Sequence, residues 1–109
     1  MQKIEKLTAA AFPVAVRNGV VLVDFFAQWH GPCHKQWDVL SALADQDRFP
    51  EEVKITKVDV DEAPVIAAKF EVDMIPTLVV FRDGEEVGRI VGVAGEKELL
   101  NLVAPAGEE

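Results

Sequence analysis

The chain has 109 residues, 50% of them hydrophobic, and carries 11 Lys+Arg against 19 Asp+Glu for a net charge of −8. This length predicts one domain over residues 1–109, the hydrophobic fraction excludes wholesale disorder, and the acidity without any basic run argues against a nucleic-acid or membrane-surface partner. The single cysteine, Cys33, leaves no partner for an internal disulfide and so excludes the small disulfide-rich secreted scaffolds.

The first half of the sequence alternates strand and helix patterns. In chain order we expect a short edge strand at Lys3–Leu7, a helix from Thr8 to about Arg17, a strand at Val20–Ala27 and a helix from Pro32 to about Asp47. Thr8 is suited to cap the first helix, and Pro32 suits the first position of the second. Val20–Ala27 is apolar almost throughout, which is typical of a central strand covered on both faces. Trp37 falls at the apolar spacing of the second helix and is expected to pack in the core.

The second half continues this alternation and then ends in a hairpin and a helix. We expect a strand at Val53–Val60, a helix at Pro64–Phe70, strands at Pro76–Phe81 and Glu86–Val91, and a closing helix at Glu96–Val103. Asp61–Glu62 is expected to cap the short helix, and Asp83-Gly84 to turn the hairpin. Strands that alternate with helices predict an α/β domain with a central mixed β-sheet and helices on both faces. Only the tail, Ala104–Glu109, is expected to be loose.

Nothing in the sequence indicates a membrane or export segment. The longest apolar stretches, Gly19–Val23 and Ile75–Phe81, are far too short to cross a bilayer. Met1–Thr8 is mixed and charged, without the apolar core of a signal peptide. We therefore expect a cytoplasmic protein with neither a membrane nor a nucleic-acid partner, and no cofactor is indicated.

The segment between Asp24 and His34 is where chemistry is expected. It follows the predicted central strand and opens the long helix, which is the usual place for a site in an open α/β sheet. A helix N-terminus carries partial positive charge and free N–H groups, which stabilise a thiolate. Cys33 lies in the first turn of that helix and has a histidine on either side, His30 and His34. Asp24 interrupts an apolar run on a buried strand, where a carboxylate is costly unless it is paired or protonated.

Residues Trp29–Cys33 read Trp-His-Gly-Pro-Cys, which resembles the thioredoxin motif Trp-Cys-Gly-Pro-Cys in four of five positions. Other segments agree with this family in order and spacing: Asp24, Lys57, Ile75-Pro76-Thr77, Asp83-Gly84 and Val91-Gly92-Val93. The resemblance runs from about Lys3 to Val103. It implies a thioredoxin fold for the whole domain.

The resemblance implies thiol–disulfide oxidoreductase and electron-transfer chemistry, with one decisive departure. Thioredoxins attack a protein disulfide with the first cysteine of the motif and resolve the mixed disulfide with the second. Here His30 stands at the position of the nucleophile, and Cys33 matches only the resolving cysteine. One thiol cannot close an internal disulfide, so the dithiol reductase activity is expected to be lost or altered.

The resemblance also assigns roles to residues outside the motif. The matching aspartate of the family, here Asp24, moves protons to and from the second cysteine, and Lys57 on the neighbouring strand would be its partner. A cis bond is implied at Pro76, which would leave the backbone of Ile75 free to pair with an extended protein or peptide partner. The residues implied around that partner are Trp29, Gly31, Pro32, Ile75, Pro76, Val91, Gly92 and Val93.

Several hypotheses about the site stay open at this point. Cys33 could be a reactive thiol, alone or paired with His30 one helical turn earlier, or it could be a small buried hydrophobe. The protein could instead be a non-catalytic binding module that uses the groove beside Pro76. His30, Cys33 and His34 could also contribute to a metal or cluster site shared by two chains, because one chain offers no complete tetrahedral ligand set. The oligomeric state is not fixed by the sequence.

Overall fold

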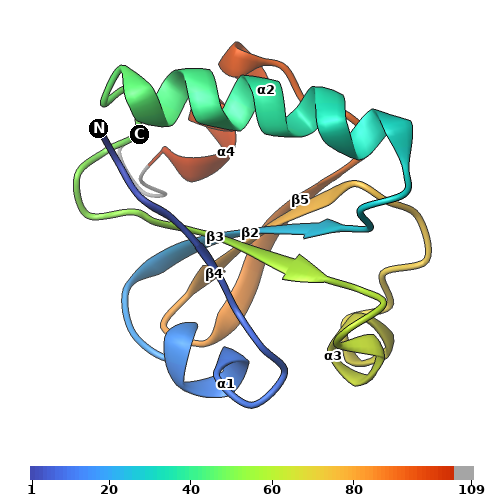
Figure 1. Ribbon diagram of the computed structural model, residues 1–109. Helices are drawn as coiled ribbons and strands as arrows, with labels where there is room; N and C mark the ends of the chain where they lie inside the picture. Colours follow the sequence, from blue (N-terminus) through green and yellow to red (C-terminus); the bar gives the residue numbers. More distant parts are fainter. Residues whose placement is uncertain (105–109) are drawn as a thin grey trace.

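Residues 1–104 are described by the structure, a computed structural model, as a five-stranded sheet in the order β1-β3-β2-β4-β5 with helices on both faces (Figure 1). The elements in chain order are β1 (Ile4–Lys6), α1 (Phe12–Ala15), β2 (Val20–Phe26), α2 (Gly31–Asp45), β3 (Lys54–Asp59), α3 (Pro64–Lys69), β4 (Thr77–Arg82), β5 (Glu85–Val91) and α4 (Glu96–Val103). The predicted α/β architecture with a central mixed sheet is confirmed.

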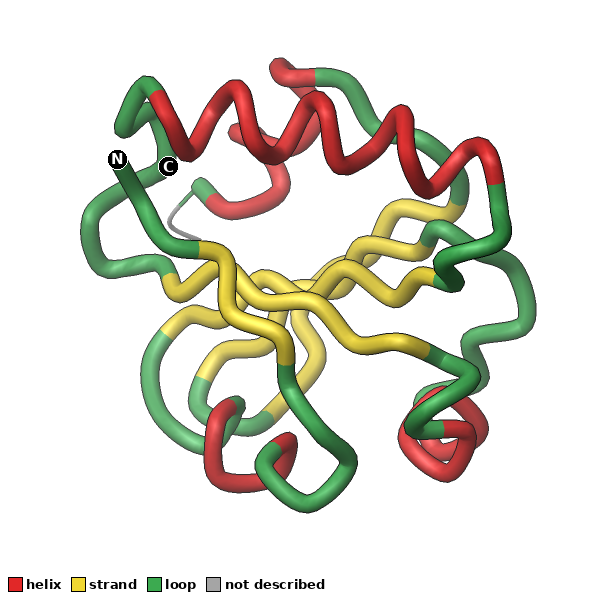
Figure 2. The backbone as a smooth tube through the Cα atoms, viewed as in Figure 1, coloured by secondary structure: helices red, strands yellow, loops and turns green. Residues whose placement is uncertain are grey.

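The central strand β2 is the axis of the sheet. It pairs in parallel with β3 and antiparallel with β4, and its side chains from Val21 to Phe26 are all buried. Helices α2 and α4 lie on one face of the sheet and α1 and α3 on the other (Figures 1 and 2). Because successive side chains of a strand point to opposite faces, Leu22, Asp24 and Phe26 face α2. Asp24 is thus a carboxylate among the apolar residues of a covered face.

The first helix is much shorter than the sequence indicated. The segment expected to be helical from Thr8 to about Arg17 forms a helix only at Phe12–Ala15. A helix starting at Thr8 would place Pro13 in its interior, where proline has no N–H to donate and its ring clashes with the preceding turn. Thr8 Oγ1 instead accepts a hydrogen bond from the Ala11 N–H at 3.1 Å, in the turn before the helix.

The predicted cap of α3 is also wrong. The N-cap of this helix is Ala63, and no side chain caps it. The carboxylate of Asp61 is engaged elsewhere, because it accepts a hydrogen bond from the Trp29 indole N–H at 2.8 Å. The hairpin prediction is confirmed: Asp83 and Gly84 both have positive φ, 50° and 90°, at the turn between β4 and β5.

The described part of the chain ends just after α4. The closing helix is confirmed at Glu96–Val103, whereas residues 105–109 of the expected loose tail lie outside the described residues. Among residues 1–104, none of the helices has the length and apolar character that crossing a bilayer requires.

Candidate functional site

The loop between β2 and α2 lies at the end of the sheet where β2 ends and β4 begins. The register pairs Phe25 of β2 with Thr77 of β4, and Thr77 in turn with Val91 of β5. The carboxyl end of β2, the start of β4 and the end of β5 are therefore neighbours (Figure 1). His30 is the N-cap of α2, and Gly31 begins the helix. The site thus combines a helix N-terminus with three strand ends.

Cys33 is fully buried in the first turn of α2. The residue is 0% exposed, and its N–H donates to the His30 carbonyl oxygen at 3.1 Å. Burial raises the pKa of the Cys33 thiol, a hydrogen bond with the Ala27 backbone lowers it, and the charge of Asp24 raises it. The thiol is therefore protonated near neutral pH, although it stands at a helix N-terminus.

His30, at the N-cap of α2, is less buried than Cys33. It is half-buried, and its ring meets that of Trp29 edge-on, with 5.4 Å between the ring centroids. Within residues 1–104, no hydrogen bond joins the His30 imidazole to the Cys33 thiol. The hypothesised Cys–His catalytic pair is therefore not formed in this structure.

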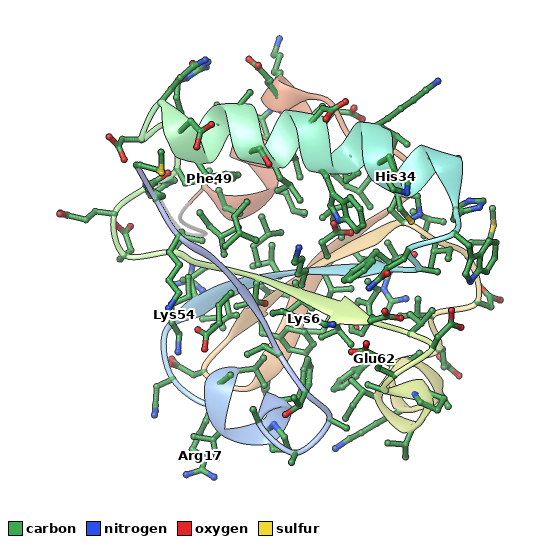
Figure 3. All side chains as sticks on the ribbon, viewed as in Figure 1. Lys6, Arg17, His34, Phe49, Lys54 and Glu62 are labelled. Atoms are coloured by element: carbon green, nitrogen blue, oxygen red, sulfur yellow. The ribbon has the colours of Figure 1, made fainter. Side chains whose placement is uncertain are left out.

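His34 turns away from Cys33 to the outside of α2. Figure 3 shows it on the part of α2 nearest the loop after β2. Its Nε2 lies 2.7 Å from the Gln28 carbonyl oxygen, and its ring packs edge-on against Trp37 at 4.7 Å. In the described part of the chain, no three His, Cys, Asp or Glu side chains gather closely enough to hold a metal ion. His30, Cys33 and His34 accordingly do not make a metal site within one chain.

Asp24 is a fully buried carboxyl group, 0% exposed, on the face of β2 that α2 covers. Lys57 of β3 and Leu78 of β4 flank it in the register. Neither carboxylate oxygen has a hydrogen-bond partner among residues 1–104. Burial raises the pKa of Asp24 to about 7, although the positive charge of Lys57 and the nearby indole N–H of Trp37, which does not reach hydrogen-bond geometry, both act to lower it. Asp24 can therefore exchange a proton near neutral pH.

Lys57 and Trp37 both lie close enough to Asp24 to act on its pKa. The Lys57 ammonium lies over the Phe26 ring at 5.6 Å and over the Trp37 ring at 5.1 Å from the centroids. Phe26 and Trp37 also meet edge-on at 4.9 Å. The sequence pattern predicts only a packing role for Trp37, but its buried indole N–H has no partner among residues 1–104. Its spacing, one helical turn after Cys33, was the signal that could have placed it at the site.

The segment around Pro76 forms the second half of the site. The Ile75–Pro76 peptide bond is cis, as the sequence resemblance implied, and the Gly92 N–H donates to the Pro76 carbonyl oxygen at 2.8 Å. The backbone groups of Ile75 make no hydrogen bond among residues 1–104. The bond between Gly92 and Pro76 places this segment beside the loop after β5.

Large apolar side chains are exposed on the loops and the strand end around this segment. They are Trp29 at 71%, Met74 at 61%, Val91 at 52% and Val93 at 43%. Trp29 is held by its hydrogen bond to Asp61, so its ring is fixed in an exposed position. Met74 was missed by the sequence analysis, although it directly precedes Ile75-Pro76. An exposed apolar surface beside unpaired backbone is suited to bind an extended peptide.

Gln36 is a second residue that the sequence analysis missed. It is 0% exposed on α2, and both ends of its side-chain amide are bonded to the backbone of Ala94, directly after Val91–Val93. Its signal in the sequence was a polar residue at an inward position of the helix, next to Trp37.

Comparisons with known proteins agree with this architecture. The family model described as Thioredoxin matches residues 3–105. The chain is 45% identical over 100 residues to the thioredoxin of Staphylococcus saprophyticus, covering 92% of this chain and 94% of that protein. It is 41% identical over 101 residues to the thioredoxin of Chlamydia trachomatis serovar D, covering 93% and 96%.

Two solved structures are similar along most of the chain. One is a mutant thioredoxin from Halobacterium salinarum NRC-1, with a TM-score of 0.80 and 36% identity, covering 93% of this chain and 88% of that one. The other, with a TM-score of 0.80 and 33% identity, covers 93% of both chains. It comes from a structure on the thiol resolving mechanism in yeast mitochondrial 1-Cys peroxiredoxin via glutathione/thioredoxin systems. The predicted thioredoxin fold is confirmed by these likenesses.

Proposed function

Because this chain belongs to the thioredoxin family of oxidoreductases, we propose that it binds extended protein segments as a thioredoxin does but cannot run an internal dithiol–disulfide cycle. One observation carries this proposal: the only cysteine, Cys33, is fully buried, and the helix N-cap holds His30 in place of a second thiol.

The chemistry of disulfide reduction explains why this replacement matters. One thiolate attacks the substrate disulfide, so that one S–S bond breaks and a mixed disulfide forms. A second thiolate then attacks that mixed disulfide, which leaves the substrate as a dithiol and the protein with an internal disulfide. His30 has no sulfur to make the first bond. The buried, protonated thiol of Cys33 is a poor substitute, because the thiolate is the nucleophile.

The peptide-binding half of the site does not depend on the missing sulfur. The unpaired backbone of Ile75 is placed to pair with an extended segment, and the exposed side chains of Trp29, Val91 and Val93 offer apolar contacts. We assign Gly31, Pro32, Pro76 and Gly92 to the backbone walls of this surface. A protein partner is in keeping with the similar chain whose structure concerns a 1-Cys peroxiredoxin.

Asp24 and Lys57 are proposed to keep a proton-transfer role toward Cys33. Asp24 titrates near neutral pH and its charge acts on that thiol, so in a His30→Cys variant it is suited to take the Cys33 proton as Cys33 attacks the mixed disulfide between residue 30 and the substrate. This role becomes visible only when a sulfur is placed at position 30. The cytoplasmic location expected from the sequence stays a prediction.

Reduction of insulin disulfides, with dithiothreitol as the source of electrons, tests the catalytic part of the proposal. The wild-type chain and the control variant His30→Ser are expected to reduce insulin no faster than dithiothreitol alone. The His30→Cys variant restores both sulfurs and is expected to exceed that background by at least about tenfold. Wild-type turnover equal to that of His30→Cys would show that the missing nucleophile is not needed.

Binding is tested separately with a peptide that cannot exchange sulfur. The S-alkylated insulin B chain is titrated against the wild-type chain and against Trp29→Ala, with Val14→Ala as a control. Val14 is also an exposed apolar residue, at 63%, but it lies on α1, away from the site. Saturable binding that Trp29→Ala weakens and Val14→Ala does not is the expected result. Equal binding by all three proteins would contradict a peptide surface at Trp29.

A further inference from the structure

Gln36 forms a two-point connection between α2 and the loop after β5. Its Nε2 donates to the Ala94 carbonyl oxygen at 3.0 Å, and the Ala94 N–H donates to its Oε1 at 2.7 Å. Both residues are 0% exposed, so these bonds are shielded from water. A buried amide is costly unless its polar atoms are bonded, and here both ends of the side chain are satisfied by one backbone residue.

This connection fixes one side of the loop that carries Val91 and Val93. On the other side, the loop is tied to the residue just before β4 by the bond from the Gly92 N–H to the Pro76 carbonyl oxygen, 2.8 Å long. Gly92 has a φ of 95°, a conformation that other residues rarely adopt, so the chain turns sharply at the first of these ties. Val93 therefore lies between two fixed points, and Val91 is held by its pairing with Thr77 at the end of β5.

The same residue links this loop to the first turn of α2, which carries Cys33. Gln36 lies one helical turn after Cys33 on the buried side of α2. His30 is the N-cap of the same helix. Movement of Ala94 would be transmitted to α2 through two hydrogen bonds, and the distance between Trp29 and the Val91–Val93 loop would change with it. A residue needed only for packing at this position would be apolar, because an amide adds a desolvation cost without adding apolar contact.

We propose that Gln36 is a positioning residue for the peptide-binding surface: it holds the loop Val91–Val93 at the spacing that an extended peptide with an apolar side chain requires. This inference rests on the proposed function, because it assigns Gln36 to the same surface. It adds that the geometry of that surface is set from the core of the helix, by a residue that the peptide does not touch.

Two substitutions separate positioning from packing. Gln36→Leu keeps the bulk of the side chain but leaves the Ala94 N–H and carbonyl without partners. Gln36→Glu keeps the shape and makes the connection depend on pH, since a protonated carboxyl can both accept from the Ala94 N–H and donate to its carbonyl, whereas a carboxylate repels that carbonyl. Gln46→Leu is the matched control, because Gln46 is an exposed glutamine at the C-cap of the same helix.

The loop is monitored by hydrogen exchange of the Ala94 amide, compared with amides of β2. We expect exchange of this amide to be at least about tenfold faster in Gln36→Leu, with β2 little changed. In Gln36→Glu the amide is protected at about pH 4 and exposed at about pH 8. Asp24 on the facing strand also titrates in this interval, so the wild-type chain is measured at both pH values as the reference. An Ala94 amide as protected in Gln36→Leu as in wild type overturns the proposal.

Affinity for the S-alkylated insulin B chain is the second measurement. Gln36→Leu, and Gln36→Glu at about pH 8, are expected to bind at least about fivefold more weakly than wild type, with Gln46→Leu unchanged. If wild type binds the peptide but the Gln36 variants bind equally well, the positioning role is wrong and the proposed function stands. If wild type binds no peptide while the Ala94 amide responds as expected, the proposed function fails, and the role of Gln36 toward a peptide fails with it.

Discussion

Asp24 and Lys57 are partners in the register of β2 and β3, but no ion pair joins them in the part of the chain that the structure describes. The Lys57 ammonium lies instead over the rings of Phe26 and Trp37. Lys57 therefore offsets only part of the cost of burying Asp24, and the pKa of Asp24 is raised to about 7 despite the nearby positive charge. This imperfect pairing makes the protein sensitive to pH at its centre.

Asp24→Asn is expected to stabilise the protein at alkaline pH. The pKa of Asp24 is raised from 3.8 to about 7 in the folded chain, and the unfolded chain keeps the ordinary value. Between these values the folded state holds a proton that the unfolded state has released, so the contribution of Asp24 to stability falls as the pH rises. At about pH 8 the loss is on the order of 4 kcal/mol, and an asparagine does not incur it.

Urea unfolding of the wild-type chain and of Asp24→Asn, at about pH 4, 6 and 8, measures this effect. The difference in the free energy of unfolding between the two proteins is expected to grow in favour of Asp24→Asn as the pH rises. Asp45→Asn on the exposed end of α2 is the matched control and is expected to show no such growth. A difference that stays constant over this pH range would mean that Asp24 titrates normally.

Trp37→Phe is expected to raise the pKa of Asp24 further. The substitution removes the indole N–H, which lowers the pKa of Asp24, but keeps an aromatic ring beside Phe26 and Lys57. Carbon-13 NMR of the Asp24 carboxyl, followed over a pH titration, gives the pKa directly. Trp29→Phe is the control, since its indole bonds to Asp61 instead. An Asp24 pKa that falls or stays unchanged in Trp37→Phe would mean that Trp37 serves only as packing.

The Cys33 thiol is expected to react slowly in the folded protein. Burial raises its pKa and also blocks access by a reagent, so both effects act in the same direction. Alkylation by iodoacetamide near neutral pH should be at least about tenfold slower than in urea, where the thiol is released from the core. Equal rates in the folded and the unfolded chain would indicate an accessible thiol and would weaken the proposed loss of exchange chemistry.

The sequence was most informative where apolar patterning or turn chemistry acts locally. The run Val20–Ala27 identified the central strand, and Asp83-Gly84 identified the hairpin, because each pattern has few alternative structures. The expected helix from Thr8 was wrong, because it would place Pro13, which has no N–H to donate, in the helix interior. The cap expected from Asp61 was wrong because its carboxylate is taken by a residue far away in sequence.

The same distinction applies to the candidate site. Asp24 could be singled out because one carboxylate in an apolar strand is unusual, and His30 and Cys33 because they stand in a recognisable motif. Gln36 and Met74 carry much weaker signals. A polar residue on a helix normally indicates a solvated face, and a methionine in a loop has no distinctive pattern. Their roles depend on Ala94 and on the neighbouring strand ends, and these contacts exist only after the chain has folded.

Arg89→Ala is expected to loosen the segment that leads to Pro76. Arg89 of β5 donates to the Phe70 carbonyl oxygen at 2.8 Å, just after α3, and to both carboxylate oxygens of Glu86 at 2.6 and 2.7 Å. Losing these bonds should lower the free energy of unfolding by about 1–2 kcal/mol, because the Phe70 carbonyl loses a charged partner. Arg17→Ala, at an exposed position, is the control. If the Phe70 tie also supports the peptide surface, hydrogen exchange should quicken in residues 71–75 more than in β2, whereas a uniform change would indicate a purely global effect.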